Sequence, residues 1–240
     1  MDQLVKLLSG NTYPGRGIVL GASADGEAVR IAYFIMGRSA NSRNRIFVMS
    51  DERTLETRAA DPSKMQDPSL IIYAPFRRLA DGTLIVTNGD QTDTVRDALV
   101  SGRTFRDALM TRAFEPDAPN YTPRISGLIT FGKGKPAFEL AILKSLDGAP
   151  ETVVRSFFTY DSLPAGTGLF LHTYRGDGSP IPSFEGEPER VDITGSFEDW
   201  TDSIWENLNE SNKISLFTCE ASPDGTRIRT RLINKYEAVS

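Results

Sequence analysis

Short apolar segments alternate with polar turns along most of the chain, and this pattern predicts a protein built mainly of β-strands. Turn signals such as Asp25-Gly26 and Asp81-Gly82 separate neighbouring segments, and their close spacing favours hairpins over helical crossovers. The sheet should therefore be largely antiparallel. We expect strands at residues 18–20, 31–36, 46–49, 70–73, 84–86, 127–131, 137–143, 153–158, 168–173, 213–219 and 226–233.

Two similar segments, residues 95–100 and 105–110, carry a helical rather than an alternating pattern. The first should end near Gly102, and the second should begin after Thr104. Because no third copy follows, we interpret them as two amphipathic helices that pack on one sheet, and not as a repeat architecture.

A further helix is predicted after Ser196, which is a good N-cap residue. Its apolar side chains recur at helical spacing and should face the core: Phe197, Trp200, Ile204 and Leu208. A loop rich in glycine, proline and serine is expected at 175–189. Arginines alternate with other residues at 226–231, so we expect them to form a solvated face.

Composition is that of an ordinary globular protein, with 240 residues of which 39% are hydrophobic and 25% are charged. We expect a single domain over residues 1–240. The net charge of −5 argues against a nucleic-acid-binding protein. The first eight residues are too short and too charged for a secretory signal, and no apolar run has the length of a membrane span, so we expect a cytoplasmic location without membrane association.

The chain has a single cysteine, Cys219, and a single histidine, His172. This excludes an internal disulfide and the familiar Cys/His zinc sites. Both residues lie in apolar segments, which predicts packing roles for both. A serine or cysteine nucleophile would have to recruit His172, and no nucleophile elbow is present.

A run of polar residues follows the strand predicted at 84–86 and leads directly into a helix. Its members, Asn88, Gly89, Asp90, Gln91 and Thr92, offer donors, acceptors and a close backbone approach, as recognition of a nucleobase or a sugar requires. One of the residues 92–94 should cap the helix. The alternative is an ordinary Asn-Gly turn followed by a capped helix.

An arginine-rich loop at 37–45 connects two apolar strands. Its three arginines, Arg38, Arg43 and Arg45, suit a phosphorylated ligand because guanidinium groups bind phosphate bidentately. The alternative is a solvated hairpin loop.

Three prolines stiffen the loop at 112–124, which displays several polar side chains. Rigid polar loops suit binding sites, although a stiff connector with solvated carboxylates is the alternative. The candidate residues in this loop are Glu115, Asp117, Asn120, Thr122 and Arg124.

Tyr73 ends a predicted strand, and its hydroxyl would need a partner if it is buried. Such a hydroxyl can donate a hydrogen bond to a developing charge. A plain core tyrosine is the alternative.

These segments together resemble the archaeal-type IMP cyclohydrolase family, including its bacterial members. The resemblance is strong over residues 13–130, and farther along it rests on length and strand pattern. It is carried by residues 13–17, 38–45, 67–73, 87–94 and 120–125.

The resemblance implies an α+β fold, a four-layer αββα sandwich like that of the N-terminal nucleophile hydrolases but without autoprocessing. It also implies an activity, the ring closure of 5-formamidoimidazole-4-carboxamide ribonucleotide (FAICAR) to IMP with loss of water, the last step of de novo purine synthesis. Neither a metal nor a redox cofactor is needed. The partners are then the purine ribonucleotide substrate and product, and a homo-oligomer is left open.

Three residues match the family's catalytic positions: Arg43 aligns with an arginine that contacts substrate, Tyr73 with the active-site tyrosine and Glu115 with the active-site carboxylate. Asp117 is a rival to Glu115, because the spacing to 122–124 differs from the archaeal pattern. We expect Tyr73 to donate to the formyl oxygen and Glu115 to accept a proton or to orient water.

The remaining candidates would bind substrate, with Arg38, Arg43 and Arg45 competing for the 5′-phosphate. The full set expected to bind substrate is Arg38, Arg45, Asn88, Gly89, Asp90, Thr92, Asp117, Asn120, Thr122 and Arg124.

Two alternative functions remain at this stage. A nucleotide-binding sensor would keep the pocket but lack the chemistry. A hydrolase on the same fold would need an activated nucleophile, which the sequence does not display.

Overall fold

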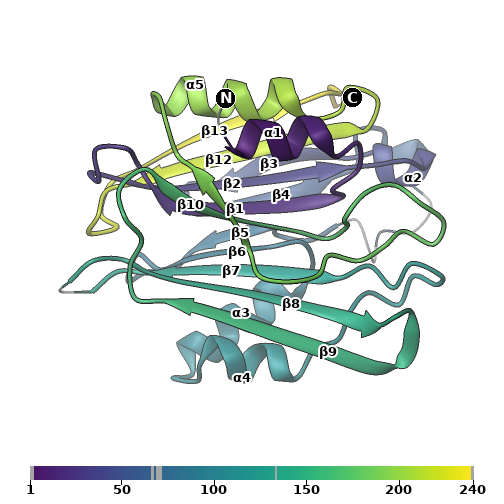
Figure 1. The fold of residues 1–240 in the computed structure, drawn as a ribbon, viewed down its shortest axis with the longest axis horizontal. Helices are drawn as coiled ribbons and strands as arrows, with labels where there is room; N and C mark the ends of the chain where they lie inside the picture. The colour runs from purple at the N-terminus through teal and green to yellow at the C-terminus, as the bar shows by residue number, and fades with distance from the viewer. Residues whose placement is uncertain (1–2, 66–67, 69–71, 133, 239–240) are drawn as a thin grey trace.

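The computed structural model describes residues 3–65, 68, 72–132 and 134–238. Two antiparallel sheets pack face to face, and helices cover the outer face of each sheet, so that the elements form four layers (Figure 1). This arrangement confirms the predicted α+β class and the antiparallel pairing.

The first sheet has six strands in the order β11-β10-β1-β2-β12-β13, and all neighbouring pairs are antiparallel. Its strands are β1 (Arg16–Ala22), β2 (Val29–Met36), β10 (Thr167–His172), β11 (Glu189–Asp192), β12 (Lys213–Ala221) and β13 (Ile228–Asn234).

The second sheet has seven strands that follow one another in chain order from β3 to β9. They are β3 (Ile46–Asp51), β4 (Thr54–Arg58), β5 (Phe76–Arg78), β6 (Leu84–Thr87), β7 (Arg124–Thr130), β8 (Ala137–Leu146) and β9 (Ala149–Tyr160).

Helices α1 (Gln3–Gly10) and α5 (Phe197–Asn207) lie over the first sheet, and α3 (Gln91–Val100) and α4 (Phe105–Met110) lie over the second (Figure 1). The short helix α2 (Ala40–Arg43) and the 3₁₀ turn η1 (Pro62–Lys64) belong to connections. The two similar helical segments therefore pack side by side on one sheet, as predicted.

The apolar core has three parts, one between the sheets and one beneath each helical layer. All eight residues of β2 are buried, because this central strand is covered on both faces. A continuous apolar run is the pattern expected of such a strand.

The elements that were not predicted are α1, α2, η1, β4, β5 and β11. The strands β5 and β11 have only three and four residues, and each carries charged side chains, so neither shows an apolar run. Of the strand predicted at 70–73, residues 70 and 71 lie outside the described part, and Ile72 and Tyr73 are not in a strand.

Two of the predicted caps are confirmed, since the side chains of Thr104 and Ser196 accept hydrogen bonds from the first turns of α4 and α5. The prediction that a residue of 92–94 caps α3 is wrong. The N-cap residue is Asp90, and its side chain makes no capping bond. The reason is that arginines outside the helix occupy this carboxylate.

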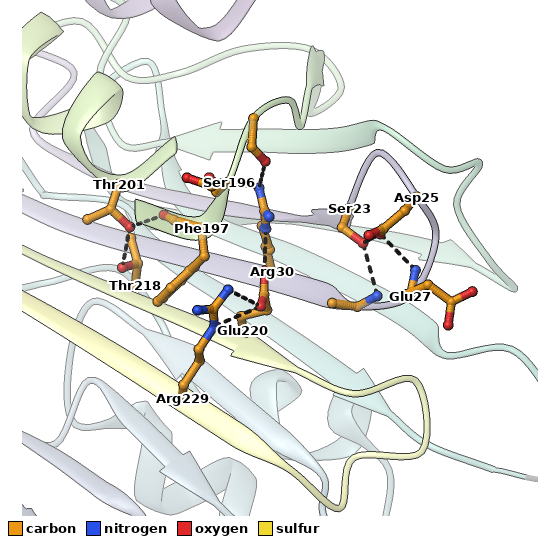
Figure 2. A network of polar contacts seen from close by, with 12 residues as sticks. Ser23, Asp25, Glu27, Arg30, Ser196, Phe197, Thr201, Thr218, Glu220 and Arg229 are labelled. Atoms are coloured by element: carbon orange, nitrogen blue, oxygen red, sulfur yellow. Dashed lines mark hydrogen bonds and ion pairs between the residues drawn. The ribbon is translucent and has the colours of Figure 1, made fainter. Parts of the chain in front are cut away.

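The predicted arginine face on β13 is exposed, and it is also ion-paired with its surroundings. Arg229 contacts both Glu198 of α5 and Glu220 of β12, and Glu220 accepts a second bond, of 2.7 Å, from the Nε of Arg30 (Figure 2). Arg231 pairs with Asp202 at 2.7 Å. These contacts connect helix α5 to the sheet beneath it.

Within the part of the chain that the structure describes, no helix is long and apolar enough to cross a membrane.

The Ser196 cap gives a test of the fold. We expect Ser196→Ala to lower the free energy of unfolding by about 1 kcal/mol, because a backbone N–H in the first turn of α5 loses its acceptor. The melting temperature should fall by roughly 2–4 °C for a chain of this size. Urea unfolding followed by circular dichroism measures the change. Ser203→Ala, within the same helix, is the matched control and should not destabilise the protein.

Candidate active site

A cluster of polar side chains occupies one end of the sandwich, where β1 and β7 begin and β2, β6 and β10 end. Most of its members are almost completely buried. Buried polar groups normally have hydrogen-bond partners, so the groups that lack them mark places where a ligand can bind.

Two tyrosine hydroxyls meet at the inner wall of this cluster. The hydroxyl of Tyr33, on β2, lies 2.8 Å from that of Tyr73, and both side chains are buried. The backbone of Tyr73 is held by Thr57, whose hydroxyl accepts from the Tyr73 N–H at 2.9 Å. Burial raises the pKa of both phenols above the ordinary value, so both remain protonated donors at neutral pH.

Two arginines approach the same place and carry N–H groups without partners. Arg45 is fully buried; its Nε donates to the Ser42 carbonyl at 2.8 Å, whereas its Nη1 has no partner among the described residues. The buried Nε of Arg16 also has none. Burial and the neighbouring Arg16 charge lower the pKa of Arg45. An anion or a carbonyl oxygen would satisfy these donors.

Glu115, on the proline-stiffened loop, interacts electrostatically with these arginines and is only 3% exposed. Its backbone N–H donates to the Thr122 carbonyl at 2.9 Å, but its carboxylate makes no hydrogen bond or ion pair with any described residue. Burial raises the pKa of Glu115 to about 7, although Arg16 and Arg124 favour the ionised form. Both protonation states are therefore populated near neutral pH, which suits proton transfer.

Asp117, on the same loop, is used differently. Its carboxylate accepts from the backbone N–H of Thr122 at 2.6 Å and also from the Thr122 hydroxyl. That hydroxyl lies 2.6 Å from the hydroxyl of Tyr174, whose ring stacks on Tyr13. Asp117 and Thr122 thus brace the loop that presents Glu115.

The polar run after β6 is largely occupied by internal bonds. Asn88 is fully buried; its Nδ2 donates to the Pro123 carbonyl at 2.8 Å, and its Oδ1 accepts from Ile125 N at 2.8 Å and from Gln91 Nε2 at 3.1 Å. The Thr92 hydroxyl bonds within the run as well, to the Gly89 carbonyl. The run therefore joins the end of β6 to the start of β7.

The same run positions Arg124. The guanidinium donates to Gln91 Oε1 at 2.6 Å and pairs with Asp90 at 2.7 Å, and Asp90 also pairs with Arg112. Partial burial opposes ionisation of Asp90, but the two arginines outweigh it and hold the pKa of this carboxyl below its ordinary value.

Gly89 fits this arrangement because it has no side chain. A Cβ at position 89 would lie 2.3 Å from the Nη1 of Arg124. The close backbone approach predicted for Gly89 thus accommodates the Arg124 side chain.

Three further sequence candidates make contacts within loops. Arg43, on α2, donates from its Nε to the Gly37 carbonyl at 3.0 Å. Arg38 pairs with Asp177, and its guanidinium lies 5.0 Å from the centre of the Tyr13 ring. Asn120 accepts from the Ile181 N–H at 3.3 Å. Arg38 and Asn120 therefore hold the loop that follows β10.

Sequence reasoning missed Arg16, Tyr33 and Tyr174 as members of the site. Arg16 had a detectable signal, since a cation preceded by Pro14 and Gly15 stands directly before an apolar strand. Tyr33 had none, because it lies within a continuous apolar run and its position beside Tyr73 depends on sheet packing.

His172 and Cys219 have the predicted packing roles. His172 lies between Phe170 and Phe184, and Cys219 is fully buried. Within residues 3–65, 68, 72–132 and 134–238, no group of three or more histidine, cysteine or acidic side chains could hold a metal ion.

Comparison with known proteins agrees with this site. The family model described as IMP cyclohydrolase-like protein matches residues 13–225. An IMP cyclohydrolase of Methanopyrus kandleri is 32% identical over 206 residues, which cover 80% of this chain and 92% of that protein. An IMP cyclohydrolase of Methanococcus maripaludis strain C7 is 33% identical over 122 residues, which cover 49% of this chain and 58% of that protein. The search of solved structures found no significant match.

The matched region runs from the start of the cluster, before Arg16, to beyond Tyr174, and so includes every residue described above as part of the site. The chain belongs to the IMP cyclohydrolase-like protein family.

Proposed function

We propose that this protein is an IMP cyclohydrolase, which converts FAICAR to IMP with loss of water. The observation that carries the proposal is the Glu115 carboxylate, which has a pKa of about 7 and lies near Arg16 and Arg45, each of which has a buried N–H group without a partner among the described residues. The named activity of the relatives agrees with it. The sensor alternative predicts binding of IMP without ring closure.

The reaction requires two proton transfers and a substrate conformation in which the carboxamide and formamido groups lie against each other. The carboxamide nitrogen attacks the formyl carbon and loses one proton, while the formyl oxygen gains one to become a hydroxyl. The formamide nitrogen then loses its proton as that hydroxyl leaves as water. A positioned base, a donor to the formyl oxygen and a cavity that holds both substituents together would accelerate these steps.

Glu115 is proposed as the group that accepts the carboxamide proton. Asp117 was its rival, but the Asp117 carboxylate is occupied by two bonds from Thr122, whereas that of Glu115 has no hydrogen-bond partner among the described residues. Tyr73 is proposed to donate to the formyl oxygen, and Tyr33 to hold the Tyr73 hydroxyl in place.

The arginines are proposed to have separate roles. Arg16 and Arg45 lie close to Tyr73 and Glu115, so they suit substrate oxygens near the reacting atoms. Arg38 is 35% exposed and suits the 5′-phosphate at the rim. Arg43, whose Nε donates to the Gly37 carbonyl, is proposed to contact substrate through the rest of its guanidinium.

Asn88, Gly89, Asp90 and Thr92 are proposed to act through Arg124, which they orient toward the substrate. Asn120 and Thr122 are proposed to shape the opposite wall. The substrate-facing groups are buried, so entry requires a covering loop to move. The loop after β10 is the best candidate, since the Arg38–Asp177 pair that holds it is exposed, and such pairs contribute at most about 1 kcal/mol.

We also propose that the four layers correspond to the N-terminal nucleophile hydrolase architecture. Two face-to-face antiparallel sheets with helices on both outer faces support this assignment.

Removing the proposed base or donor should abolish ring closure. We expect Glu115→Gln to lower kcat by about 10²–10⁴-fold, the range for loss of a general base, and Tyr73→Phe to lower it strongly as well. Absorbance reports purine formation from FAICAR. Glu187→Gln and Tyr160→Phe, at exposed or partly exposed positions, are the matched controls. Full turnover in both active-site variants contradicts the assignment, and IMP binding by an inactive wild-type protein favours the sensor.

Tyr33→Phe tests the hydroxyl pair. The substitution leaves the Tyr73 hydroxyl without its partner, so we expect kcat to fall by about tenfold while KM changes little, because only the orientation of the donor is lost. Steady-state kinetics with FAICAR measures both parameters. An unchanged kcat means that Tyr33 is only a core residue.

The raised pKa of Glu115 predicts a pH dependence of stability. Between the ordinary pKa of 4.5 and about 7, the folded protein binds more protons than the unfolded chain, so this group's contribution to stability decreases as pH rises. Glu115→Gln removes this dependence. Its melting temperature relative to wild type should therefore increase from about pH 5 to about pH 8. Glu187→Gln should show no such trend, and a flat difference for Glu115→Gln means that this carboxyl has an ordinary pKa.

A further inference from the structure

Three of the four sheet edges are protected against pairing with another strand. The edge strand β11 has four residues and packs beside α1. In the edge strand β3, the backbone N–H and carbonyl of Phe47 are both hydrogen-bonded to the Asn234 side chain, so they are not open to another strand. The edge strand β13 carries Arg229 and Arg231, which are ion-paired with α5. Short length, covering groups and charges are the usual devices that protect an edge.

The fourth edge, β9, lacks this protection. It has twelve residues, and among the described residues its backbone pairs only with β8, so the N–H and carbonyl groups of the other side are free. Its middle is apolar and half-buried, with Val153, Val154, Phe157 and Phe158. The register against β8 shifts between Ser145 and Leu146, at the start of β9, and the strand is regularly paired from Val153 onward. A long and open edge of this kind is a template for another strand.

We propose that β9 pairs with β9 of a second copy of this chain, antiparallel about a two-fold axis, so that two seven-stranded sheets become continuous. An antiparallel homodimeric contact of this kind is self-complementary and closes after two copies. The two-fold axis runs perpendicular to the sheet, so side chains that lie opposite each other point to the same face. The axis must then pass between the two copies of one residue, which is the centre of the register.

The charged residues of β9 determine which register of the β9–β9 pair is favourable. The charged residues of β9 are Glu151 and Arg155. A centre at Val153 places each Glu151 opposite Arg155 of the second copy, which forms two ion pairs. A centre at Arg155 would instead oppose two arginines, and a centre at Ser156 would bring Glu151 opposite Asp161. Val153 therefore gives the complementary arrangement.

The face that carries these charges is also held in place. Arg155 donates from Nε and Nη2 to the Arg112 carbonyl, at 3.2 and 2.7 Å, which fixes its direction beside α4. Val153 and Phe157 pack on the same helical layer, and the Arg106 guanidinium lies 4.7 Å from the centre of the Phe157 ring. These three side chains therefore lose little freedom when the second copy binds, whereas Glu151 is exposed.

Light scattering after size exclusion should give twice the 26.4 kDa of one chain. Val153→Cys then tests the register, because directly opposed residues have Cα atoms about 4.5–5.5 Å apart, within disulfide range. Mild oxidation should cross-link this variant. Thr159→Cys is the control, since its copies would be about 40 Å apart in this register. Cys219 is buried and should not compete.

Charge reversal provides the second test. Glu151→Arg should weaken the dimer about tenfold or more, because two attractions become repulsions, and Glu151→Arg combined with Arg155→Glu should restore it. Glu206→Arg, on exposed α5, is the matched control and should leave the dimer unchanged. A monomer at high micromolar concentration, or a dimer that Val153→Cys does not cross-link, overturns the proposal. None of these readouts depends on FAICAR turnover.

Discussion

The face-to-face packing of the two sheets is the constraint on which the other features depend. It buries all of β2, and the side chains of Tyr33, Tyr73, Arg45 and Glu115 are buried as well. In that environment ionisation of an acid is unfavourable, so Glu115 titrates near neutrality and the tyrosines stay protonated. The core thus contributes stability and also sets the protonation states of the site.

Polar groups at this end of the sandwich fall into two kinds. The polar groups of Asn88, Thr92 and Asp117 form internal hydrogen bonds and maintain the geometry of two segments, the run after β6 and the loop at 112–124. The second kind comprises buried N–H donors of Arg16 and Arg45 and the carboxylate of Glu115, which have no such bonds. Unsatisfied groups cost free energy in the folded protein, and a ligand that pairs with them recovers it. The second kind therefore indicates where a ligand can bind, and the first kind holds those groups in position.

Much of the fold was predictable, because local periodicity and capping report burial directly. The strand at β2, the paired helices α3 and α4 and the Ser196 cap follow from patterns within a few residues. The short strands β5 and β11 were not predictable, since their pairing is imposed by neighbours. The prediction of the α3 cap failed for a related reason, because the Asp90 carboxylate forms ion pairs with Arg112 and Arg124, which are distant in sequence.

The sequence by itself determined the antiparallel α+β class, the resemblance to IMP cyclohydrolases and the loops that carry the candidate residues. The tertiary structure decided which side chains meet. It paired Tyr33 with Tyr73, placed Arg16 near Glu115, and joined Arg43 to the Gly37 carbonyl. It also showed that the Asp117 carboxylate is hydrogen-bonded to Thr122 whereas burial raises the pKa of Glu115, a difference that the local sequence does not indicate. The physical reason is that desolvation and hydrogen-bond partners depend on contacts between segments far apart in the chain, and a local pattern carries no record of them.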